Sequence, residues 1–122
     1  MELVLQITVG IVSLPLLALG LRSMLAPRGM GTAMAIAPRG AAGLSTIRGV
    51  AGGLFFAAVS MLALGLFTGQ TLWFLAVAII MAAVMVGRFV GIVADGFDRA
   101  VLPPLVVEAV IGSALVLAHL CL

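Results

Sequence analysis

Four ionisable residues stand in or beside stretches of sequence that are otherwise apolar: Arg48, Arg88, Asp95 and Glu108. The arginine guanidinium binds carboxylates and phosphates through a planar fork of N–H donors. A charged residue at the centre of a bilayer costs roughly 2.5–3.5 kcal/mol, so such residues normally pair with one another inside the protein. The chemistry to expect from this set is therefore ion pairing or the binding of an anion.

The rest of the chain has the composition of an integral membrane protein. Of its 122 residues, 65% are hydrophobic and 8% are charged, whereas a soluble domain carries about 25% charged residues. A chain of this length cannot bury so much apolar surface within itself. The formal charge of +2 is the balance of six arginines, spread along the sequence, and four acidic residues. The arginines lack the clustering of a nucleic-acid-binding patch, so no nucleic acid is expected as a partner.

Four apolar segments are long enough to cross a bilayer as helices. They cover about residues 3–25, 44–68, 72–94 and 101–122. Each supplies roughly 20 residues, which at about 1.5 Å per residue spans a hydrocarbon core of about 30 Å. The sequence therefore predicts an all-α membrane protein. We expect a single four-helix transmembrane bundle over residues 1–122, with both termini on the same side.

Arginine placement predicts the direction of these helices. The loops after the first and third segments hold Arg22, Arg28, Arg39 and Arg99. Because basic residues favour the cytoplasmic side, we expect both termini outside and the protein in a bacterial inner membrane. The loop over residues 26–43 contains Ala-Pro-Arg-Gly twice, at 26–29 and 37–40. Residues 30–37, which run from the first repeat to the opening alanine of the second, are expected to form a short interfacial segment on the cytoplasmic surface.

Alternating helix direction brings three of the charged residues to a similar depth. Counted from the cytoplasmic ends of their helices, Arg48, Arg88 and Glu108 lie roughly 6–10 Å into the membrane. Asp95 follows Arg88 by about two helical turns and shares its face. One interpretation is a closed ion-pair network that fixes helix order. The other leaves one arginine free to hold a headgroup, carboxylate or phosphate. Arg48 could also extend its side chain to the surface.

Glycines with a spacing of about four residues accompany the charged residues. They are Gly49, Gly52 and Gly53 in the second segment, and Gly87 and Gly91 in the third. Small residues at this spacing let helix backbones approach closely. We expect these glycines to pack the second and third helices together, or alternatively to form the seam of a homodimer.

No catalytic residue, metal site or cofactor is expected. The single histidine, His119, and the single cysteine, Cys121, cannot form a metal site alone. His119 lies about 16 Å along its helix from Glu108, too far for the two to act together as acid and base.

The charged residues and their glycine neighbours follow a distinctive order along the chain. That order is Arg48-Gly49-x-x-Gly52-Gly53, then Gly87-Arg88, then Asp95-Gly96, then Glu108. It resembles a family of small bacterial four-helix integral membrane proteins catalogued as a domain of unknown function. The resemblance implies a four-helix bundle with these charged residues at its polar positions, and it supplies no activity. A more distant architectural similarity to DoxX-like proteins suggests a redox-associated accessory role.

The leading functional hypothesis is a non-enzymatic protein that binds an amphipathic anion, such as a lipid headgroup, near the cytoplasmic side of the bilayer. The alternative is an accessory subunit of a larger membrane complex, or a self-associating bundle, that docks through its glycine faces.

Overall fold

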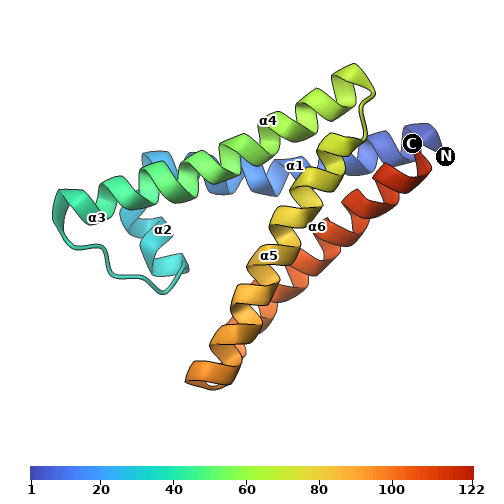
Figure 1. Cartoon of the computed structure of the whole chain (residues 1–122). Helices are drawn as coiled ribbons and strands as arrows, with labels where there is room; N and C mark the ends of the chain where they lie inside the picture. Colours follow the sequence, from blue (N-terminus) through green and yellow to red (C-terminus); the bar gives the residue numbers. More distant parts are fainter. The chain divides into compact units, whose positions relative to one another are not determined.

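The computed structural model describes residues 1–122, and the chain is almost entirely helical, with no β-strand (Figure 1). The long helices are α1 (Glu2–Leu25), a continuous helix made of α3 (Gly40–Thr46), the π-helical turn η1 (Ile47–Gly52) and α4 (Gly53–Thr68), then α5 (Leu72–Asp95) and α6 (Leu102–Cys121). These four helices are long and apolar enough to cross a membrane. The predicted all-α fold with four membrane-length helices is confirmed.

The loop between the first two long helices contains a helix of its own. Residues Pro27–Ala33 form α2, whereas the sequence placed an interfacial segment at residues 30–37, and the next long helix begins at Gly40 rather than at residue 44. The two Ala-Pro-Arg-Gly repeats mark both helix starts. Pro27 occupies the first turn of α2, where a missing N–H costs nothing. Gly40 opens α3 with a φ of 59°, which glycine adopts without steric cost.

The chain divides into two compact units. The hairpin unit comprises residues 1–9 and 61–122, and the central unit comprises residues 10–60. Both boundaries fall inside long helices, α1 and α4, so neither unit begins or ends at a linker.

In the hairpin unit, α5 and α6 form an antiparallel pair joined by a short turn and the 3-10 turn η2 (Arg99–Val101) (Figure 1). Buried residues recur every three or four positions on both helices, which places them on one face of each. They are Phe74, Val77, Ala78 and Met81 on α5, and Ile111, Leu115 and Ala118 on α6. The two chain ends also meet in this unit, where Glu2 and Leu122 line a small cavity.

Cross-helix contacts define the register of this hairpin. At one end, Nδ1 of His119 lies 3.0 Å from the hydroxyl of Thr71. Further along, a Cβ added to Gly112 would lie 3.5 Å from the Cβ of Met81. Contacts further along α5 therefore involve residues earlier on α6. Nearest the connecting turn, residue 88 of α5 pairs with residue 108 of α6.

Hydroxyl side chains within the long helices bond to their own backbone, which suits a helix surrounded by lipid. Thr8, Ser13, Ser23 and Ser60 each donate to a carbonyl three or four residues earlier. No buried side-chain nitrogen or oxygen lacks a hydrogen-bond partner.

We predict that Gly65→Ala lowers the free energy of unfolding by about 1–3 kcal/mol, the usual cost of overpacking a core. A Cβ at this position would lie 2.5 Å from Cε1 of Phe74, whose side chain is 1% exposed. Gly112→Ala is the matched control, because its Cβ would make an ordinary 3.5 Å contact. Unfolding in detergent micelles, followed by circular dichroism, measures both. Equal stability of the two variants would contradict the packing of Gly65 on Phe74.

Candidate functional site

An ion pair between Arg88 of α5 and Glu108 of α6 joins the two helices of the hairpin. Nε of Arg88 donates to both carboxylate oxygens of Glu108 at 2.8 Å, and Nη2 lies 2.7 Å from Oε1. The side chains are 33% and 13% exposed, respectively. Charged hydrogen bonds of this length are among the stronger contacts that side chains make.

The position of the pair follows from the hairpin register. Arg88 lies seven residues before the end of α5 at Asp95, and Glu108 lies six residues after the start of α6 at Leu102. The pair is therefore about 10 Å along the helix axes from the connecting turn. An unpaired charge at that distance from the turn would raise the free energy of the protein in lipid, and pairing lowers this cost.

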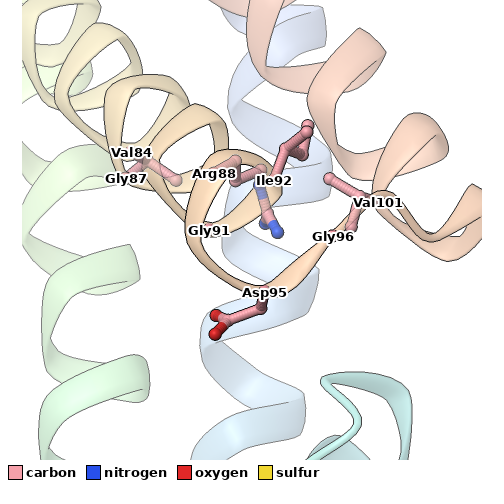
Figure 2. Close-up of a pocket in the computed structure, with 8 residues that line it drawn as sticks. All are labelled: Val84, Gly87, Arg88, Gly91, Ile92, Asp95, Gly96 and Val101. Carbon is pink, nitrogen blue, oxygen red and sulfur yellow. The ribbon is translucent and has the colours of Figure 1, made fainter.

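An open groove of about 480 Å³ lies beside this ion pair, and we call it the Arg88 groove (Figure 2). Its lining combines three glycines, three aliphatic side chains and two charged ones: Gly87, Gly91, Gly96, Val84, Ile92, Val101, Arg88 and Asp95. A Cβ added to Gly87 or Gly91 would meet no atom of the hairpin unit within 4 Å. Glycine at these two positions therefore keeps the groove open rather than packing α5 against α6.

Glu108 binds only some of the N–H donors of the Arg88 guanidinium. The group carries five N–H donors, and the contacts to Glu108 use Nε and Nη2. The two N–H groups of Nη1 and one N–H group of Nη2 are left to bind another partner. Glu108 thus holds the guanidinium in place while part of its fork stays available to an oxygen anion in the groove.

Asp95 gives the groove a second charge of opposite sign. It is the last residue of α5 and is exposed, and Figure 2 shows its carboxylate turned away from the Arg88 guanidinium. Because Glu108 already balances Arg88, the exposed Asp95 leaves the site with a formal charge of −1 from one guanidinium and two carboxylates. An isolated anion is therefore less well matched to this site than a group that also carries a positive charge.

Arg48 belongs to the central unit and has a structural partner there. Its side chain is exposed, and Nη1 donates to the backbone carbonyl of Met24. This carbonyl lies in the last turn of α1, where carbonyls lack intrahelical partners and a positive charge is favourable. The sequence predicts for Arg48 an ion-pair network, a bound headgroup or a side chain extended to the membrane surface. In the structure, its partner is instead the carbonyl end of a neighbouring helix.

Gly52 is a second packing residue of the central unit. A Cβ at Gly52 would lie 2.7 Å from Cγ of Met24, and one at Gly20 would lie 3.2 Å from Cβ of Phe55. These contacts run in opposite directions along the two helices, so α1 and the Gly40–Thr68 helix are antiparallel in this unit. Gly49 and Gly53 have no atom of the central unit within 4 Å of an added Cβ.

The contact between Thr71 and His119 is a site feature that sequence reasoning missed. The sequence gives His119 no partner within reach, whereas in the structure its ring nitrogen meets a hydroxyl from the turn before α5. The antiparallel hairpin provides the signal that could have found it, because two helices of similar length joined by a short turn bring the start of α5 near the end of α6.

The fold and the site define a multi-pass, all-α membrane protein with an ion pair inside its last two spans. Comparison with models of protein families, with curated protein sequences and with solved structures finds no match to this chain. The resemblance to the four-helix family of unknown function stays a prediction.

We predict that Glu108→Ala destabilises the protein by about 2 kcal/mol, because it leaves the Arg88 charge unpaired in an apolar setting. Removing both partners with Arg88→Met and Glu108→Ala together should cost less than the sum of the two single changes. Unfolding of all four proteins in the same micelles gives the coupling energy. Additive effects would show that the two residues do not stabilise each other.

Proposed function

We propose that this is a non-enzymatic membrane protein whose Arg88 groove binds the polar headgroup of a membrane amphiphile. The proposal rests on one observation. Glu108 binds one edge of the Arg88 guanidinium, and the glycines of the groove leave space beside it. A phosphate or carboxylate oxygen would complete the donors that Glu108 does not use. A rigid guanidinium loses little entropy on binding, which favours affinity.

The surroundings of the groove suit a lipid as the source of that headgroup. The groove extends from Arg88 to Gly96 and Val101, where α5 ends and the connecting turn begins. A headgroup could therefore enter from the membrane surface. Val84, an exposed apolar side chain that lines the groove one helical turn before Arg88, offers a contact for an acyl chain.

The charge of the groove favours a zwitterionic headgroup over a purely anionic one. A phosphate would contact the free edge of Arg88, and an ammonium group would balance Asp95. Phosphoethanolamine carries both groups, whereas phosphoglycerol carries only the anion. The charges of the groove thus narrow the proposed ligand from an amphipathic anion to a lipid whose headgroup carries both a phosphate and an amine.

We predict that the purified protein retains phosphatidylethanolamine in preference to phosphatidylglycerol when both are titrated in native mass spectrometry. Arg88→Lys keeps a charge for Glu108 but removes the fork, so it should weaken phosphatidylethanolamine binding about tenfold, the value of one charge-assisted hydrogen bond. Asp95→Asn should reduce the preference for ethanolamine over glycerol. Arg99→Lys, an exposed change at the same end of the hairpin, is the control.

Unchanged lipid affinity in Arg88→Lys would remove the headgroup proposal. Unchanged headgroup preference in Asp95→Asn would remove its zwitterionic form while leaving the guanidinium contact in place.

We also propose that the protein resides in a bacterial inner membrane with both ends of the chain outside. The support is the positive-inside rule, because the four arginines in loops and at helix ends all belong to the same side of a four-span topology. They are Arg22, Arg28, Arg39 and Arg99.

Cys121, an exposed free thiol, tests this orientation without a reporter fusion. We predict that a membrane-impermeant maleimide labels Cys121 in intact spheroplasts. A Cys121→Ser variant that carries Ala35→Cys in the loop before α3 should be labelled only after permeabilisation. The reverse pattern of labelling would show that the protein is inserted the other way.

Self-association, or docking as an accessory subunit, is the second candidate function. The observation that favours it is the open space over Gly87 and Gly91, since a second helix could pack on the same glycines that leave room for a headgroup. Gly87→Leu discriminates between the two, because leucine would fill the groove. Loss of lipid binding from a monomer supports the headgroup, whereas loss of a dimer in native mass spectrometry supports self-association.

A further inference from the structure

Three arginine side chains come from elements that meet where α1 gives way to α2. Arg48 of η1 donates to the carbonyl of Met24, and Nη2 of Arg22 donates to the carbonyl of Gly29 at 3.4 Å. Arg28 directly precedes that glycine in α2. We call Arg22, Arg28 and Arg48 the arginine cluster.

The elements that carry the cluster are packed against one another. Met30 and Gly31 of α2 are buried, and a Cβ added to Gly31 would lie 3.3 Å from Cδ1 of Ile47, the residue before Arg48. The turn of α2 that holds Arg28 is thus attached to the turn of η1 that holds Arg48. The three arginines are consequently held on a common framework, although each of them is exposed.

The central unit contains no group that could neutralise these charges. Residues 10–60 include four arginines, Arg39 being the fourth, and neither aspartate nor glutamate. Like charges repel when they share a surface, and the only side-chain hydrogen bonds of the cluster go to neutral carbonyls. The counter-charge must come from outside the central unit.

We propose that the arginine cluster binds a phosphate-bearing dianion. Arginine forks match phosphate oxygens, and three arginines supply more charge than a single phosphodiester balances. The cluster lies at the end of two membrane-length helices, α1 and the Gly40–Thr68 helix, and lipid phosphates are found at that level of a bilayer. Exposed Leu25, Met34 and Ile36 beside it offer apolar contacts for acyl chains. This site shares no residue with the Arg88 groove and does not depend on it.

The test uses the full chain in neutral detergent, with native mass spectrometry to measure binding of cardiolipin, a lipid with two phosphates. Arg28→Gln should weaken cardiolipin binding about tenfold, and Arg22→Gln with Arg28→Gln should weaken it further. Arg39→Gln is the matched control, because Arg39 holds the same place in the second Ala-Pro-Arg-Gly repeat but is outside the cluster. Its affinity should change less than threefold. Thermal unfolding checks that every variant stays folded.

Competition with inorganic pyrophosphate identifies the source of the dianion. Displacement of cardiolipin at similar concentrations supports the site with a soluble phosphate as its ligand, and resistance to displacement supports it with a lipid. Unchanged affinity in the double variant would overturn the proposal. So would an equal loss in Arg28→Gln and Arg39→Gln, because that result describes diffuse attraction to positive charge rather than a site.

Discussion

The energetic cost of an unpaired charge in an apolar environment constrains the hairpin of α5 and α6 more than any other interaction. Arg88 and Glu108 can each avoid that cost only if the two helices adopt the register that joins them. A slide of one helical turn would move the carboxylate about 5 Å from the guanidinium. The ion pair therefore selects among registers that apolar side chains alone would distinguish weakly, because leucine, valine and alanine pack acceptably in several of them.

The other contacts of the hairpin unit belong to the same antiparallel arrangement. This arrangement aligns the buried face of α5 with that of α6 and brings His119 to Thr71 at the far end. It also leaves Gly87 and Gly91 without a neighbour on α6, and this open space is the Arg88 groove. A change that breaks the ion pair should therefore alter both the hairpin and the groove.

The sequence predicts the helices well because membrane spans are defined by apolar length, and the observed ends of three helices differ from the expected ones by at most one residue. The Gly40 start was missed because a glycine with positive φ that opens a helix looks like an ordinary loop residue. Arg88 and Glu108 could be grouped from alternating helix direction. The partner of Arg48 could not, because a backbone carbonyl such as that of Met24 has no sequence signature. Nor could the exposure of Gly87, since small residues also mark close packing.

Charge is distributed unequally between the two units, and this matters for what each can bind. All four carboxylates of the chain belong to the hairpin unit, and four of its six arginines belong to the central unit. A site in the hairpin unit favours a ligand with some positive charge, whereas a site in the central unit favours an anion. The first expectation follows from the pairing of Arg88 with Glu108, which neutralises that arginine, and the second from the absence of carboxylates in residues 10–60. Solid-state NMR in lipid bilayers tests the pair most directly, through dipolar coupling between ¹⁵N in the Arg88 side chain and the ¹³C carboxyl of Glu108. The account predicts a strong coupling that is lost in Glu108→Gln with the label moved to the amide carbon, and the absence of coupling in the native protein would contradict it.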